Sequence, residues 1–122
     1  MTVVLDASAL LAFVQGEAGS AMVQRALEDG AVCGAANWSE MIQKIVAADR
    51  DWSLVAALLD SYGLVIEPVT RADAEAAART WRAGSQLSLA DRLCLALAER
   101  LSAEVLTADR AWGRAGRIRQ IR

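Results

Sequence analysis

Residues 3–10 of the chain read VVLDASAL, and this stretch decides the fold. Its first three residues are β-branched or apolar and predict a short buried strand. The alanines and the leucine that follow Asp6 favour a helix, which we expect to cover residues 7–14 and to end before Gly16. A buried strand that passes directly into a helix is the unit from which α/β proteins are built.

The rest of the sequence repeats this alternation of short strands with helices. The hydrophobic pattern predicts further helices over residues 20–28, 36–48, 51–61, 70–82 and 88–101, and strands over residues 2–5, 31–33, 64–66, 104–107 and 118–121. Two helices are expected to begin with a capping box, one pairing Thr70 with Asp73 and the other Ser88 with Asp91. Strands joined by helical crossovers run parallel, so the predicted fold class is α/β, with a mostly parallel central sheet of about four to five strands flanked by helices.

The composition predicts one globular domain that spans residues 1–122, since 55% of the residues are apolar and 23% are charged. No apolar run approaches the roughly 20 residues that span a bilayer, and the first six residues lack the features of a signal peptide. We therefore expect a cytoplasmic protein without a membrane segment. Cys33 and Cys94 each lie in an apolar stretch, which favours buried thiols over a disulfide.

Four acidic residues are expected at one rim of the sheet. Asp6 and Asp109 follow the ends of predicted strands, and Asp91 lies in the first turn of its helix. Glu40 lies early in the helix over residues 36–48. In α/β sheets, functional groups gather at the carboxyl ends of the strands. Each aspartate also occupies a position typical of helix capping, so a structural interpretation stands beside the functional one.

A cluster of four carboxylates predicts a bound divalent cation, because the repulsion between like charges would otherwise be costly. Ligand sets made only of oxygen favour Mg²⁺ or Mn²⁺. The chain contains no histidine, which excludes catalysis by histidine and the usual zinc ligand sets. Water activated by the metal is then the expected nucleophile, and such a site favours hydrolysis of phosphodiester bonds.

The positive charge of the chain is concentrated near residue 122. The net charge is −2, but residues 110–122 hold five arginines and no acidic residue, which leaves residues 1–109 at −7. The five are Arg110, Arg114, Arg117, Arg119 and Arg122. We interpret them either as contacts for RNA phosphates beside the acidic site or as a solvated terminus, and the sequence alone supports both.

Four segments taken together resemble a known family. They are VVLDASAL at residues 3–10, Ser39-Glu40, LSLADRLCLALA at residues 87–98 and LTADRAW at residues 106–112. In order and spacing they are similar to PIN-domain proteins of the VapC toxin type, over essentially the whole chain.

The resemblance implies a set of site residues. Its catalytic acids, which hold Mg²⁺ or Mn²⁺, would be Asp6, Glu40, Asp91 and Asp109. The residues beside them that would contact the substrate are Ser8, Thr107 and Arg110. For the two hydroxyls, local capping of the backbone is an equal alternative.

The resemblance also implies an activity. Such proteins are endoribonuclease toxins of type II toxin–antitoxin systems, which cut RNA, often transfer RNA. Each is held inactive by a VapB-like antitoxin, and a homodimer is expected.

Two other functions stay open. A catalytically inert PIN-like module would keep the fold and bind a partner without cleavage. A phosphatase would use Asp6 as a covalent nucleophile and would need a nearby lysine. The chain has a single lysine, Lys44, which lies one helical turn after Glu40 and is expected to pair with it.

Overall fold

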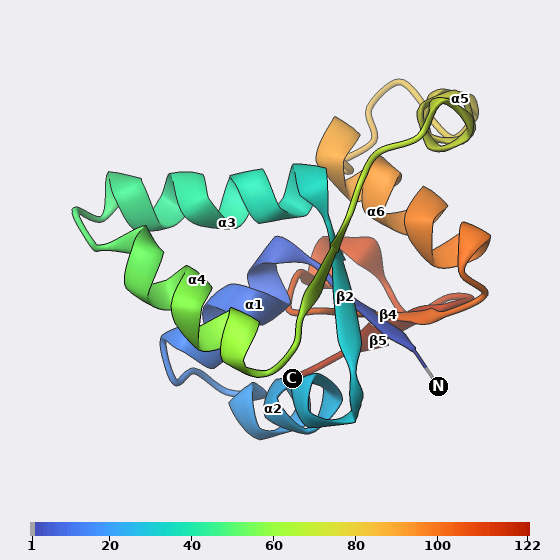
Figure 1. Ribbon diagram of the computed structural model, residues 1–122. Coiled ribbons are helices and arrows are strands. Elements are labelled where there is room, and N and C mark those ends of the chain that lie inside the picture. Colours follow the sequence, from blue (N-terminus) through green and yellow to red (C-terminus); the bar gives the residue numbers. More distant parts are fainter. Residues whose placement is uncertain (1) are drawn as a thin grey trace.

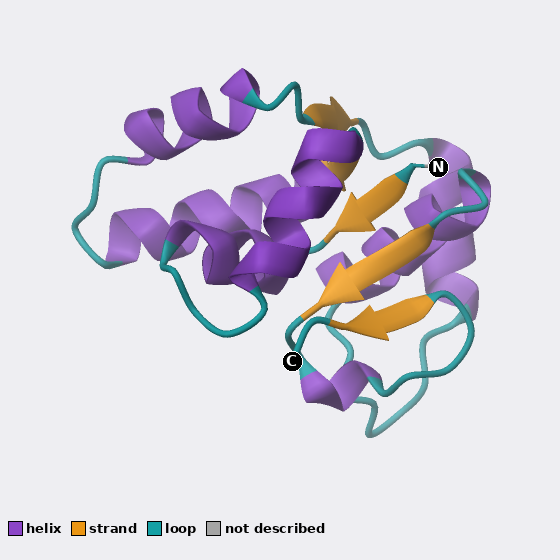
Figure 2. Cartoon of the chain, turned by 90° about the horizontal axis from the view of Figure 1, so that it is seen from below, coloured by secondary structure: helices purple, strands orange, loops and turns teal. Residues whose placement is uncertain are grey.

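The computed structural model describes residues 2–122 and contains a five-stranded sheet with helices on both faces (Figure 1). The strands are β1 (Val3–Leu5), β2 (Ala31–Gly34), β3 (Val65–Glu67), β4 (Glu104–Thr107) and β5 (Ile118–Gln120). They lie in the order β3-β2-β1-β4-β5, and all four pairings are parallel. The arrows in clear view in Figure 2 point the same way. The predicted α/β fold class is therefore confirmed.

The predicted helices are also present. They are α1 (Ala7–Val14), α2 (Ser20–Asp29), α3 (Ala35–Ala47), α4 (Trp52–Ser61), α5 (Arg71–Arg79) and α6 (Leu89–Arg100), and the 3₁₀ helix η1 (Arg110–Trp112) follows β4. Both capping boxes form, because the Thr70 and Ser88 hydroxyls each accept a hydrogen bond from a backbone N–H three residues later at 3.1 Å. Local sequence signals thus fix where α5 and α6 begin.

One helix ends earlier than predicted. The expected helix over residues 70–82 stops at Arg79, and Trp81 beyond it is exposed. The Thr80 hydroxyl and backbone N–H both donate to the Ala77 carbonyl, at 2.9 and 3.3 Å. Bonds that reach back only three residues tighten the last turn and do not continue an α-helix.

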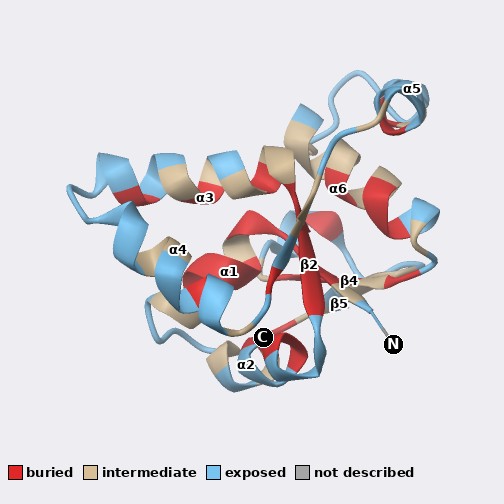
Figure 3. Ribbon diagram, viewed as in Figure 1, coloured by how far each residue is buried: buried red, intermediate tan, exposed pale blue. Residues whose placement is uncertain are grey.

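Side chains of the central strands alternate between two cores. On β1, Val4 packs against α6, whereas Leu5 packs into the core beneath α1, α2, α3 and α4. Val105 and Leu106 on β4 divide between the same two cores. Figure 3 shows the buried residues along the sheet and on the helix sides that face it. Burial on both faces explains why the strands read as continuous apolar runs.

The two cysteines are buried free thiols, as predicted. Cys33 belongs to the core under α1, and Cys94 belongs to the core under α6, so the sheet separates them. Burial raises the pKa of both thiols, which keeps them protonated and unreactive at neutral pH. Within residues 2–122, no helix has the length and apolar character that crossing a bilayer requires.

An ion pair between Arg100 and Asp73 joins α6 to α5. Arg100 donates to both oxygens of Asp73, from Nε at 2.9 Å and from Nη2 at 3.1 Å. The Asp73 side chain is only 4% exposed. Burial raises the pKa of this carboxyl, but hydrogen bonds from Arg100 and Thr70 outweigh it and leave the pKa below its usual value. Asp73 therefore stays charged in the folded protein at neutral pH.

Candidate active site

Asp6 lies where β1 passes into α1, and three donors hold its carboxylate. The Ser8 hydroxyl and the Ala9 backbone N–H donate to Oδ1 at 2.7 and 2.8 Å, and the Thr107 hydroxyl donates to Oδ2 at 2.6 Å. The residue is 3% exposed. Asp6 is thus both the N-cap of α1 and a carboxylate fixed at the carboxyl end of the central strand.

The Ser8 and Thr107 hydroxyls join the ends of β1 and β4. Besides donating to Asp6, Ser8 Oγ accepts from the Ala108 N–H at 2.8 Å, and Thr107 Oγ1 accepts from the Asp109 N–H at 3.0 Å. Thr107 is fully buried, so its hydroxyl acts on Asp6 and Asp109. Ser8 is partly exposed, so a substrate could reach its hydroxyl, whereas the Thr107 hydroxyl is closed off from solvent. Substrate contact by either residue stays a prediction.

Asp91 and Asp109 also serve as helix caps. Asp91 Oδ2 accepts from the Ser88 N–H at 2.9 Å in the capping box of α6, and Asp109 Oδ1 accepts from the Ala111 N–H at 2.9 Å at the start of η1. Each bond engages one carboxylate oxygen, and within residues 2–122 neither of the other two oxygens receives a hydrogen bond. Capping and site formation are therefore compatible, because the cap holds one oxygen and leaves the other for a ligand.

Glu40 is oriented by Asn37, a residue that the sequence analysis did not single out. Asn37 is 1% exposed, and its Nδ2 donates to Glu40 Oε1 at 3.2 Å and to the Ala90 carbonyl at 3.4 Å. It therefore links α3 to the first turn of α6, beside Asp91. The available signal was a polar residue three positions before Glu40, on the helix face that also carries buried Met41.

The four predicted acids line one pocket of ≈ 230 Å³ at the carboxyl ends of the strands. Its lining residues are Asp6, Ala7, Ser8, Glu40, Lys44, Ser88, Asp91 and Asp109. Among the predicted substrate contacts, Ser8 lines this pocket and Arg110 lines a neighbouring one. Thr107 does not line the pocket but donates a hydrogen bond to Asp6, which does. Residues from the start of α1, from α3, from α6 and from the segment after β4 thus meet at one rim, although they lie far apart in the sequence.

The electrostatics of the pocket favour a cation. Burial raises the pKa of Asp6 to about 6, and the hydrogen bonds from Thr107, Ala9 and Ser8 limit that rise. The charge of Asp91 is a smaller contribution to this raised pKa. The pKa of Glu40 is also raised, mainly by burial and secondly by the negative charge of Asp91. These carboxylates repel one another, and a positive ion between them would relieve the repulsion.

The donor set fits Mg²⁺ or Mn²⁺. The acids offer only oxygen, and those of Glu40, Asp91 and Asp109 each keep an oxygen without a hydrogen bond in the described chain. Among residues 2–122, no three acidic or cysteine side chains lie close enough together to enclose an ion by themselves. Mg²⁺ usually keeps several waters and takes only one or two carboxylates directly, so an open pocket suits it better than a closed cage would.

Two observations bear on the alternative chemistry. An in-line attack on phosphorus needs a carboxylate that projects into the pocket, whereas Asp6 is 3% exposed and is held by three donors, which disfavours a phosphatase. Oδ2 accepts a single hydrogen bond, so a lone pair of Asp6 stays available to a small cation. Lys44 forms no ion pair with Glu40, contrary to expectation. Instead it lines the acidic pocket and lowers the pKa of Glu40 from a distance.

The Asn37→Ala variant is expected to lower the activity of this site about tenfold and to destabilise the fold by about 1–2 kcal/mol, because Glu40 loses its donor and a buried side chain is removed. Turnover and urea denaturation measure the two effects. Gln43→Ala, on the exposed side of the same helix, is the matched control. Equal activities of the two variants would show that Asn37 does not position Glu40.

A family model described as PIN domain matches residues 3–118. The chain is 35% identical over 107 residues to VapC ribonuclease Mb2780c of Mycobacterium bovis and equally to Ribonuclease VapC42 of Mycobacterium tuberculosis; each match covers 79% of this chain and 82% of the relative. A solved structure described as a toxin-antitoxin complex from Klebsiella pneumoniae aligns with a TM-score of 0.75 over 98% of both chains, at 18% identity, which is a likeness of fold.

Proposed function

The chain belongs to the PIN-domain family, to the VapC type, and from that membership we propose that it is a Mg²⁺- or Mn²⁺-dependent endoribonuclease that hydrolyses phosphodiester bonds of RNA. The observation that supports this most strongly is the single pocket that Asp6, Glu40, Asp91 and Asp109 line together. The family's relatives are named as ribonucleases, and a pocket lined by carboxylates agrees with metal-assisted hydrolysis.

The carboxylates would hold the ion, and the surrounding groups would hold the carboxylates. When bound there, a divalent cation would supply a lowered pKa for nearby water and would offset negative charge on the phosphate. Asp6 is kept ionised and fixed in place by Ser8, Ala9 and Thr107, so that it meets the ion without rearranging. Asn37 fixes Glu40 in the same way.

Lys44 contributes a positive charge at the edge of the same pocket. Without it, a polyanion approaching four carboxylates would meet only repulsion from the side chains of this pocket. In the proposed reaction, Lys44 attracts the phosphate group and helps to orient it for attack.

The biological setting is proposed by the same reasoning. We propose that the protein is the toxin of a type II toxin–antitoxin pair, that a VapB-like antitoxin holds it inactive, and that it acts as a homodimer on cytoplasmic RNA, with transfer RNA as the expected substrate. The names of the relatives and the description of the Klebsiella pneumoniae complex support the toxin role and the antitoxin partner. The homodimer and the transfer RNA substrate rest on the resemblance to the family alone.

Incubation of the purified protein with total RNA tests the proposed activity. We expect cleavage in Mg²⁺, none in EDTA, and a loss on the order of a thousandfold in the Asp91→Asn variant, because a carboxylate that offsets the ion's charge is removed. Asparagine retains an oxygen that can accept from the Ser88 N–H, so α6 stays capped.

Asp60→Asn is the matched control, since Asp60 is an exposed aspartate on α4, outside the pocket. Calorimetric titration with Mn²⁺ accompanies the assay. Metal binding without cleavage of any RNA would favour the inert binding module, and cleavage that survives Asp91→Asn would contradict the proposed site.

A further inference from the structure

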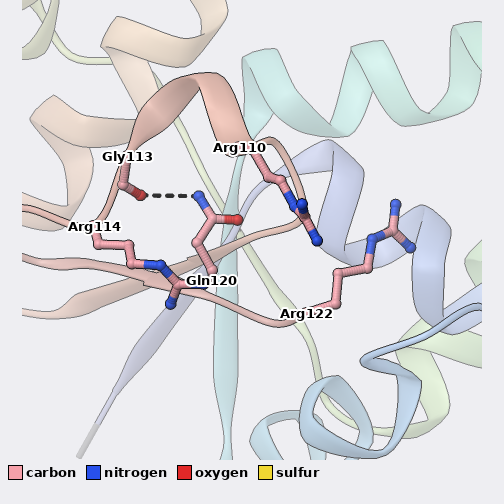
Figure 4. A pocket seen from close by; sticks show the side chains of 5 residues that line it. All are labelled: Arg110, Gly113, Arg114, Gln120 and Arg122. Carbon is pink, nitrogen blue, oxygen red and sulfur yellow. Dashed lines mark hydrogen bonds between the residues drawn. The ribbon is translucent and has the colours of Figure 1, made fainter.

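A second, basic pocket adjoins the acidic one. Its volume is ≈ 560 Å³, and it is lined by Arg110, Gly113, Arg114, Gln120 and Arg122. Figure 4 shows Gln120 between Arg114 on one side and Arg110 and Arg122 on the other. Among residues 2–122, no acidic side chain lines this pocket, in contrast to the neighbouring one.

The five arginines near residue 122 are not equivalent. Arg117 donates to Glu99 at 2.9 Å and Arg119 to Glu104 at 3.4 Å, so two of the five charges are matched by carboxylates outside the basic pocket. Arg122 makes a long contact with Glu17 at 3.5 Å. Arg110 and Arg114 form no ion pair in the described part of the chain. The unmatched positive charge therefore lies in the pocket.

Gln120 holds the pocket beside the acidic site. Its Nε2 donates to the Asp109 carbonyl and to the Gly113 carbonyl, both at 2.9 Å, and so ties β5 to the two ends of η1. Asp109 faces the acidic pocket, and the next residue, Arg110, lines the basic one. The peptide unit between Asp109 and Arg110 thus connects the two pockets, and the hydrogen bond from Gln120 to the Asp109 carbonyl fixes its position.

We propose that this basic pocket binds a backbone phosphate of the RNA strand that flanks the bond to be cut. The proposal rests on the proposed function, because it takes RNA as the substrate of the acidic site. Guanidinium groups bind phosphate oxygens through paired charge-assisted hydrogen bonds. A polymer with a phosphate at every nucleotide can fill both pockets at once, which a single small anion cannot do.

Binding of RNA in the absence of cleavage tests the proposal. A fluorescently labelled single-stranded RNA is titrated with the full-length protein in EDTA at several chloride concentrations, and anisotropy gives Kd. For the double variant Arg110→Gln/Arg114→Gln, we expect Kd to rise about tenfold. The slope of log K against log salt should fall by about 0.7 for each phosphate that the variant no longer binds, the value for single strands.

The double variant Arg117→Gln/Arg119→Gln is the matched control. It removes the same net charge from the same segment but leaves the pocket lining intact, and its exposed ion pairs contribute little stability. Thermal melting verifies that both variants are folded. We expect the Kd of the control to change less than twofold. An equal rise in both variants would reduce the effect to general electrostatics and overturn the proposal, as would no rise in either.

Two further measurements distinguish other anions. Displacement of the RNA by inorganic phosphate at matched ionic strength would indicate a site for free phosphate, and preference for polyglutamate over RNA would indicate an acidic protein segment; either result overturns the proposal. Failure of the proposed activity is recognised separately, because this binding assay needs no cleavage and the Asp91→Asn assay does not involve the arginines.

Discussion

The Asp6→Asn variant is expected to lose RNA cleavage by a factor on the order of a thousand while remaining folded. The amide removes one negative charge from the acidic pocket and leaves a single acceptor oxygen where two now accept from Ser8, Ala9 and Thr107. The attraction for a cation therefore weakens at the centre of the site. A cleavage assay in Mg²⁺, with Asp60→Asn as the control, measures the loss.

The stability of the same variant depends on pH in a defined direction. The pKa of Asp6 is raised from 3.8 to about 6 in the folded protein, so the folded state binds the proton more tightly and wild-type stability falls as the pH rises through this window. The amide that replaces the carboxyl does not titrate, so in EDTA the variant should gain stability relative to wild type between pH 4 and pH 7, by up to about 3 kcal/mol.

Urea denaturation at both pH values measures this difference. A variant that is unfolded at every pH would instead identify Asp6 as a structural residue, required by β1 and α1. A folded variant that cleaves RNA as fast as the wild type would remove Asp6 from the active site.

The Arg100→Met variant is expected to lower the free energy of unfolding by about 3 kcal/mol at neutral pH. Asp73 is nearly inaccessible to solvent, and the variant would leave its carboxylate buried between α5 and α6 with Thr70 as its remaining donor among residues 2–122. Arg71→Met is the control, because the Arg71–Glu75 pair is exposed and contributes little.

The pH dependence of this second effect runs in the opposite sense. The pKa of Asp73 lies below its ordinary value of 3.8 in the folded protein, so the stabilisation is complete above that value and is lost as the pH falls through the folded pKa. The difference between wild type and Arg100→Met should therefore be large at pH 7 and smaller at pH 3. A difference that is equal at the two pH values would show that a loss of packing, and not the charge pair, explains the effect.

Much of the acidic site could be predicted because its signals are local. Asp6 and Asp109 follow apolar strands, and Asp91 is indicated by a capping box whose hydrogen bonds both form. Strand ends and helix starts in a parallel α/β sheet share one rim, so local signals also place these acids together. The roles of the individual acids as ligands stay predictions.

The contacts that cross the molecule could not be predicted in this way. Nothing near Asn37 in the sequence indicates that it reaches the Ala90 carbonyl, 53 residues away, while it orients Glu40. The even run of five arginines gave no sign that Glu99 and Glu104 would match two of them. Such pairings depend on the register of β4 with β5 and on the position of α6, which only the assembled fold determines.

The bond between Thr107 and Asp6 has a consequence for synthesis of the protein. It joins residues 101 positions apart, and β1 lies between β2 and β4 in the sheet. A nascent chain whose residues 104–109 are still inside the ribosome has neither β4 nor Asp109 in place, and Asp6 lacks the hydroxyl that holds it. A protein of this design therefore cannot complete its acidic pocket before residues 104–109 have left the ribosome.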